Sequence, residues 1–129
     1  MSVLVWWAVA AAVVVILARL LDDPIRQGRE ALARRRQASL RAEALLLAWL
    51  SPDQRAQYLS RGRFEVTTAA GHRYRVCPGG VVRLDPRGLA YCIEATSPVP
   101  VADEMLAFKL LLETDERRFL SIAHRYPYT

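Results

Sequence analysis

The chain opens with an uninterrupted apolar run, and this run determines how the rest is organised. Within residues 1–21 no charged residue occurs before Arg19. A helix needs about 20 apolar residues to cross a hydrocarbon layer of ~30 Å, so residues 1–21 are predicted to form a single transmembrane helix. Trp6 and Trp7 near one end and Arg19 near the other are predicted to anchor this helix at the two membrane interfaces.

Small residues within the run indicate a possible contact surface for a second helix. Ala8, Ala11 and Ala12, together with Ala10, let another membrane helix approach closely. Alanine is also a common apolar residue in membrane spans, so the pattern leaves open whether these positions mark a contact.

A removable signal peptide is the alternative interpretation of the same run. Such peptides have a basic start, a shorter apolar core and small residues at the cleavage site. Here only methionine and serine precede the core, and residues 17–21 form a poor cleavage site. These features favour an uncleaved anchor.

A charged segment, residues 22–44, follows the apolar run. Asp22, Asp23 and Pro24 predict the start of a new helix, with a capping carboxylate ahead of a proline. Because this helix is polar on most faces, it is predicted to be a juxtamembrane stalk. The residues predicted to contact anionic lipid headgroups or an acidic partner are Arg26, Arg29, Arg34, Arg35 and Arg36.

The position of these arginines also predicts the topology. Basic residues remain on the cytoplasmic side of a membrane, which places the N-terminus outside and the C-terminal domain in the cytoplasm. The whole chain carries a net charge of +5, from 18 Lys and Arg against 13 Asp and Glu. Its two cysteines are too few for a disulfide framework, and cytoplasmic thiols are normally reduced.

Residues 45–125 are predicted to form one small α+β domain. Residues 51–54 read Ser-Pro-Asp-Gln, which matches a capping box with proline at the first helical position. We therefore expect a short helix through Ser60, ended by Gly62.

Four short runs of alternating apolar and polar residues follow, separated by turns rich in glycine and proline. This pattern predicts an antiparallel β-meander. The predicted strands cover residues 64–67, 74–77, 81–84 and 89–93. Period two predicts that one face of the sheet carries Phe64, Val66, Tyr74, Val76, Leu84 and Tyr91.

Helical spacing returns at Asp103, where apolar residues recur at steps of three and four. Thr114 and Asp115 form a capping signal that leaves open one helix or two. The chain is predicted to end in a tail, residues 126–129, which begins to leave the fold at Arg125. The apolar stripe of this last helical region is Met105, Phe108, Leu112, Phe119 and Ile122.

The predicted fold class is therefore α+β. An N-terminal transmembrane helix and a charged stalk helix precede a small domain, in which helices flank an antiparallel meander and cover one of its faces.

Candidate groups for chemistry are few. His72, Cys77, Cys92 and His124 are the soft metal ligands, and they lack the close pairs of a structural zinc site. No nucleophile motif accompanies the cysteines, and the glycines after Pro78 fit a hairpin turn rather than a phosphate loop. The sequence therefore predicts no catalytic, metal or cofactor-binding residue, and the role of the cysteines stays open.

A nucleic-acid-binding module is the main alternative outside enzymes. Arginines with nearby tyrosines on a sheet can bind single strands by charge and stacking. The same arginines fit the solvated face of a half-buried sheet, and no recognised binding motif accompanies them, which disfavours nucleic acid as a partner. The residues concerned are Arg61, Arg63, Arg73, Arg75, Arg83 and Arg87, with Tyr74 and Tyr91.

Residues 49–123 also contain a set of recognisable short segments. They are Leu50 to Gln54 with Tyr58, Phe64 to Val66, Gly71 with Tyr74 to Val76, Asp103 to Leu110 with Leu112 and Glu113, and Glu116 to Leu120 with Ala123. In these segments the chain resembles an uncharacterised family of small bacterial proteins. Members often carry Asn-Val after the glycine turn, where this chain has Val81 and Val82. The resemblance supports the domain boundary and implies no reaction, cofactor or partner.

These patterns together predict a single-pass accessory subunit of a bacterial cytoplasmic (inner) membrane. Its helix is expected to pack beside the helices of a larger respiratory, photosynthetic or transport complex, with the domain capping the cytoplasmic face. The alternatives are a membrane-tethered nucleic-acid-binding module and, third, a thiol- or metal-dependent enzyme.

Overall fold

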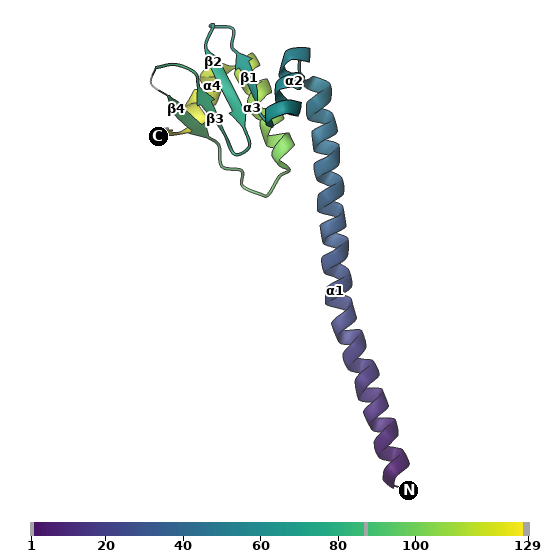
Figure 1. The fold of residues 1–129 in the computed structure, drawn as a ribbon. Helices are drawn as coiled ribbons and strands as arrows, with labels where there is room; N and C mark the ends of the chain where they lie inside the picture. Colours follow the sequence, from purple (N-terminus) through teal and green to yellow (C-terminus); the bar gives the residue numbers. More distant parts are fainter. Residues whose placement is uncertain (1, 87, 128–129) are drawn as a thin grey trace. The chain divides into compact units, whose positions relative to one another are not determined.

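The structure is a computed structural model that describes residues 2–86 and 88–127. It divides into two compact units, residues 1–37 and residues 38–129. In chain order the elements are α1 (Ser2–Trp49), α2 (Pro52–Arg61), β1 (Phe64–Thr67), β2 (Arg73–Cys77), β3 (Gly80–Arg83), β4 (Leu89–Cys92), α3 (Val101–Thr114), α4 (Glu116–Ile122) and β5 (His124–Pro127) (Figure 1).

Helix α1 runs without a break through the apolar run and the charged segment. The predicted helix start at Asp22 to Pro24 is therefore wrong, because Pro24 lies inside the helix. A proline in a helix interior removes one backbone hydrogen bond and costs about 3 kcal/mol. Strong helix formers such as alanine, leucine, arginine and glutamine on both sides of Pro24 favour continuation of the helix despite this cost.

The apolar part of α1 is long and apolar enough to cross a membrane, and none of it is buried. A signal sequence near an N-terminus has the same length and composition. The structure therefore establishes a long, exposed apolar helix.

The folded unit begins at Ala38, earlier in the chain than the predicted domain start at residue 45. The reason is that the last turns of α1 contribute to the core. Ala42, Leu46 and Leu50 are buried together with residues of the sheet and of α3.

The predicted capping box at the start of α2 is confirmed. The Ser51 hydroxyl accepts a hydrogen bond from the Gln54 amide, and the Gln54 side-chain oxygen accepts one from the Ser51 amide. Gly62 ends the helix with a φ of 69°, in the left-handed region that favours glycine. Two glutamines of α2 then cover the free edge of β1, because Gln57 accepts from the Glu65 amide and Gln54 donates to the Glu65 carbonyl.

The five strands form one antiparallel sheet in chain order, β1-β2-β3-β4-β5. The predicted meander is confirmed, with one difference in β3. Val81 pairs with Val76 and Tyr91 and is buried, whereas Leu84 lies after the strand and is half-buried. The strand starts at Gly80, where an added Cβ would lie 3.0 Å from the Tyr91 carbonyl oxygen, so this close approach of β3 and β4 requires glycine.

The prediction of a tail from Arg125 onward is wrong for the described residues. Residues 124–127 form β5, in which Tyr126 pairs with Ala90 and His124 pairs with Cys92. A short segment with a proline is acceptable there, because β5 is an edge strand.

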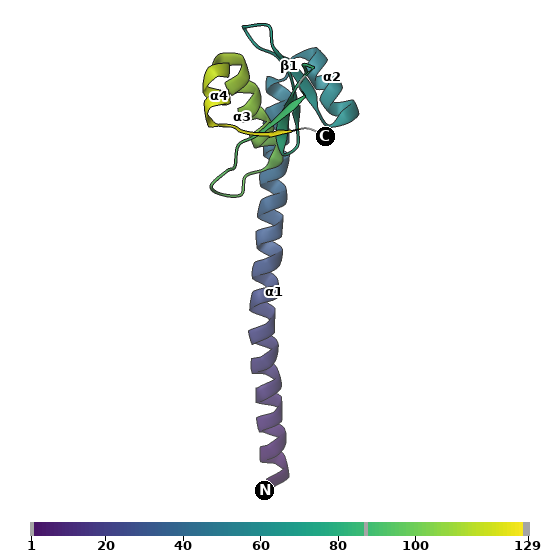
Figure 2. The ribbon, with the colours of Figure 1, turned by 90° about the vertical axis from the view of Figure 1, so that its left-hand side faces the viewer.

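Helices α3 and α4 cover one face of the sheet, as predicted, and Asp115 separates them (Figure 2). The Asp115 side chain accepts a hydrogen bond from the Arg118 amide and so caps α4. The core contains a group of aromatic rings in edge contact, in which Phe119 contacts Tyr74, Tyr91 and Phe108. The remaining buried apolar residues on this face are Phe64, Val66, Val76, Val81, Met105 and Leu112.

Candidate functional site

An apolar groove lies along α3, beside the connector that precedes this helix. It has a volume of about 360 Å³ and is lined by Ile93, Ala95, Val99, Asp103, Glu104, Ala107, Phe108, Leu111 and Ile122. Asp103 and Glu104 are its only charged lining residues. The groove therefore combines an apolar floor with negative charge at one side.

The sequence leaves this groove uncovered for a local reason. Residues 97–100 read Ser-Pro-Val-Pro, and this stiff connector places Val99 at the groove with 46 % of its surface exposed. Ile122 was predicted to lie in the core stripe, but it is 48 % exposed and lines the groove. The sequence pattern missed the groove because α3 is apolar on more than one face, so periodicity alone could not tell core from groove.

A hydrogen-bonded network joins the start of α4 to the hairpin of β1 and β2. Glu116 Oε1 accepts a hydrogen bond from the Tyr74 hydroxyl at 2.6 Å and lies 2.6 Å from His72 Nδ1. Burial by itself raises the pKa of Glu116, but hydrogen bonds from Tyr74, Thr68 and His72 outweigh it, so the net pKa lies below its usual value. Burial and the adjacent carboxylate raise the pKa of Tyr74 far above its usual range.

This network ties a loop to a helix rather than forming an open reaction site. Tyr74 is fully buried and Glu116 is largely buried, whereas the His72 ring is half-exposed. Its members are up to 44 residues apart in the chain, and no sequence signal brought them together.

The arginines named for nucleic acid lie in several different places. Arg73 and Arg75 project on the face opposite the core and both pair with Glu65, at 2.6 and 3.6 Å. The pKa of Glu65 is lowered, chiefly by the hydrogen bond from Arg73. Arg83 instead contacts Asp85 at 2.7 Å and lies over the Tyr74 ring.

The tyrosines named with them are not available for stacking. Tyr74 and Tyr91 are both buried among the core aromatics. Arg87 lies outside the described residues. The structure therefore does not assemble the predicted combination of arginines and exposed aromatics.

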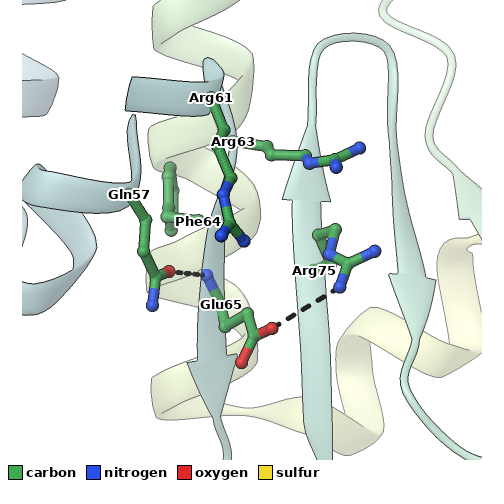
Figure 3. A pocket seen from close by; sticks show the side chains of 6 residues that line it. All are labelled: Gln57, Arg61, Arg63, Phe64, Glu65 and Arg75. Atoms are coloured by element: carbon green, nitrogen blue, oxygen red, sulfur yellow. Dashed lines mark hydrogen bonds and ion pairs between the residues drawn. The ribbon is translucent and has the colours of Figure 1, made fainter. Parts of the chain in front are cut away.

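Three of the arginines do come together at the start of β1. Arg61 ends α2, Arg63 follows Gly62, and Arg75 projects from β2, and all three line one small pocket with Gln57, Phe64 and Glu65 (Figure 3). The pocket has a volume of about 30 Å³. Its lining is basic and includes one carboxylate, that of Glu65.

The cysteines lie on the sheet face opposite the core. Cys77 lies on β2 and pairs with Gly80. Cys92 lies two strands away, on β4, and pairs with His124 of β5. Burial and the charges of Glu104 and Glu94 raise the pKa of the Cys92 thiol, which favours its protonated form. Among the residues described here, no group of three His, Cys, Asp or Glu side chains is placed to hold a metal ion.

The residues predicted to contact membrane or partner belong to the N-terminal unit. Trp6 and Trp7 are each 72 % exposed. Ala8, Ala11 and Ala12 are exposed at positions i, i+3 and i+4, which share one helix face. The arginines predicted to contact headgroups or a partner are exposed on the same helix, namely Arg19, Arg26, Arg29, Arg34, Arg35 and Arg36.

Comparison with known proteins identifies no relative, because no family model, curated protein or solved structure matches the chain. The resemblance of residues 49–123 to a family of small bacterial proteins therefore stays a prediction.

Proposed function

We propose that the protein is a single-pass accessory subunit of a larger complex in the cytoplasmic membrane. The observation that carries this proposal is the exposure of the whole apolar part of α1. Apolar side chains on every face of a helix are unfavourable in water, and lipid or neighbouring membrane helices remove that cost. In this proposal Trp6, Trp7 and Arg19 lie at the membrane interfaces, and Ala8, Ala11 and Ala12 contact a partner helix.

The same proposal gives the charged part of α1 its role. Its arginines contact anionic lipid headgroups or an acidic partner surface on the cytoplasmic side, with the N-terminus of the chain outside. The folded unit then caps the cytoplasmic face of the complex.

We assign the groove on α3 as the docking surface for the partner subunit. Its occupant is an apolar segment that carries basic residues, because Asp103 and Glu104 border an otherwise apolar lining. Apolar side chains fill the groove, and the basic residues neutralise the two carboxylates, which favours this partner over an acidic one.

Extraction of the full chain from its membrane in the mildest nonionic detergent tests the accessory role. We expect the chain to co-purify with larger membrane subunits in a fixed ratio. Recovery as a lone monomer contradicts the proposal.

Matched variants test the groove within the same experiment. Ala107→Arg places a long charged side chain in the groove, whereas Ala56→Arg makes the same change at an exposed position of α2. We expect the first variant to lose the partner subunits and the second to keep them. Equal retention of partners by both variants contradicts the assignment of the groove.

Binding of a synthetic peptide measures directly whether the groove prefers an apolar segment with basic residues. A short helix with a leucine face and flanking arginines should bind the full chain in detergent, and its counterpart with glutamates in place of arginines should bind more weakly. Equal binding of the two peptides contradicts the role of Asp103 and Glu104.

A further inference from the structure

The basic pocket at the start of β1 has features that the accessory role does not use. Arg61 and Arg63 are exposed, and within residues 2–86 and 88–127 neither has an ion-pair partner. Arg75 reaches Glu65 Oε1 only at 3.6 Å, and Arg73 holds the other carboxylate oxygen, Oε2, at 2.6 Å. The pocket lining thus holds three guanidinium groups and a single carboxylate, which Arg73 already pairs with, so positive charge is in excess.

Repulsion among like charges makes this arrangement unfavourable unless an anion offsets it. The arginines are held close together by local structure, since Gly62 turns the chain sharply between Arg61 and Arg63, and the β1–β2 register brings Arg75 opposite Glu65. Figure 3 shows their side chains over the same side of β1 and β2. Planar guanidinium groups match the oxygens of a phosphate in pairs, which makes arginine the preferred residue for this ligand.

The size of the pocket sets how a phosphate enters it. A volume of about 30 Å³ holds one or two water-sized atoms. One or two phosphate oxygens therefore enter the pocket, and the remainder of the ligand stays outside.

A second, wider hollow adjoins the pocket and shows where that remainder lies. Arg63 and Arg75 line both, and the hollow of about 320 Å³ extends across β3 and β4 to Tyr126. Its lining includes Val82 and Ala90, which give it an apolar floor. Tyr126 is 48 % exposed and lines the hollow, so part of its side chain is accessible to a ligand.

From this continuity we propose that Arg61, Arg63 and Arg75 bind the phosphate group of a phosphate monoester whose apolar part lies over Val82, Ala90 and Tyr126. The ligand is either a soluble ester or phosphatidic acid, the phospholipid that carries a phosphate monoester, since both present the same phosphate beside an apolar group. This site is separate from the groove on α3, so the phosphate proposal does not depend on whether the groove binds a partner.

Titration of the full chain in a neutral detergent tests the site with three probes at constant ionic strength. Inorganic phosphate reports the pocket alone, phenyl phosphate adds an apolar group, and dihexanoyl phosphatidic acid adds acyl chains. The readout is the chemical shift of the arginine side-chain Nε–H groups. We expect saturable binding of all three, with phenyl phosphate about fivefold tighter than inorganic phosphate.

Variants separate the pocket from the hollow. Arg61→Gln and Arg63→Gln should each weaken every probe about fivefold, whereas Arg117→Gln, which removes the same charge from an exposed position of α4, should leave binding unchanged. Tyr126→Ala should abolish the advantage of phenyl phosphate and leave inorganic phosphate unaffected. Glu65→Gln should tighten binding, because it removes the carboxylate that competes with the ligand.

Each outcome decides the proposal. The absence of saturable binding, or equal effects of Arg61→Gln and Arg117→Gln, overturns the phosphate site. Equal affinities for inorganic phosphate and phenyl phosphate overturn the assignment of the hollow. Tighter binding of phosphatidic acid than of phenyl phosphate assigns the site to lipid, and the reverse order assigns it to a soluble ester.

Discussion

Two leucines on helix α1 show how differently the two units of the chain treat apolar side chains. Leu32, in the N-terminal unit, is 62 % exposed, whereas Leu46, in the folded unit about four turns further along the same helix, is fully buried. The large apolar side chains described between residues 2 and 37 are all exposed, whereas Leu46 belongs to a core with aromatic rings in contact. The folded unit therefore supplies its own apolar environment, whereas the N-terminal unit leaves its large apolar side chains exposed, and in the proposed function lipid or a partner helix covers them.

The largest expected effect compares these two leucines directly. Leu46→Ala removes a buried side chain and should lower the free energy of unfolding of the folded unit by about 2–5 kcal/mol. Leu32→Ala makes the same change at an exposed position of the N-terminal unit and should alter it by about 0.5 kcal/mol or less. Urea unfolding followed by near-ultraviolet circular dichroism of the core aromatics measures both variants. Similar losses for the two would contradict the placement of Leu46 in the core.

The second prediction tests the dependence of the N-terminal unit on its surroundings. Ala10→Arg places a charge in the apolar part of α1 and should disfavour membrane insertion by about 3 kcal/mol. Ala33→Arg makes the same change in the charged part of the helix and should leave insertion unchanged. The fraction of protein retained in the membrane after alkaline carbonate extraction is the measurement. Retention of Ala10→Arg at the level of Ala33→Arg would refute the proposed membrane position.

The sequence reveals features of this fold that depend on neighbouring residues. The capping box of Ser51 and Gln54 needs only a few adjacent positions and was predicted correctly, and the capping signal at Asp115, which left one helix or two open, is likewise local. The alternation of β2 likewise placed Tyr74 and Val76 on the buried face. Pro24 is the exception, because a local start signal was overridden by helix formers on both sides.

Features that depend on distant residues could not be predicted in this way. The choice of Val81 over Leu84 follows from the pairing of β3 with Val76 and Tyr91, and β5 exists only because β4 offers it an edge. The candidate sites are also non-local. The groove on α3 requires the connector before it, and the basic pocket requires Arg61 of α2 beside Arg75 of β2. Composition identified these arginines but not which of them meet.

A smaller effect concerns polar side chains that are largely buried, which occur in the folded unit but not among the described residues of the N-terminal unit. Glu116→Gln weakens hydrogen bonds to an ionised acceptor and should cost about 1–3 kcal/mol at pH 7. Glu94→Gln at an exposed position is the control and should cost little.

The pH dependence of Glu116 has a definite sign. Its pKa in the folded unit lies below the usual value of 4.5, so the unfolded state takes up its proton first as the pH falls. The stabilisation is therefore present above pH 4.5 and is lost as the pH falls through the lowered pKa. The difference between wild type and Glu116→Gln should shrink over this acid range in urea unfolding. A difference that is the same at pH 7 and in this range would contradict the ionised state of Glu116.

The smallest effect concerns the ends of the helices. Helix α1 has no acidic residue in its first turn and no basic residue in its last, whereas α2 begins with a complete capping box. Ser51→Ala removes the hydroxyl that accepts from the Gln54 amide and should cost the folded unit about 1 kcal/mol. Ser51→Gly removes the same hydroxyl but lets water reach the exposed amides, and should cost only a few tenths of a kcal/mol. Equal costs for the two variants in urea unfolding would show that the hydroxyl packs rather than caps, and that α2 is held by Gln54 and Gln57 at the edge of β1 alone.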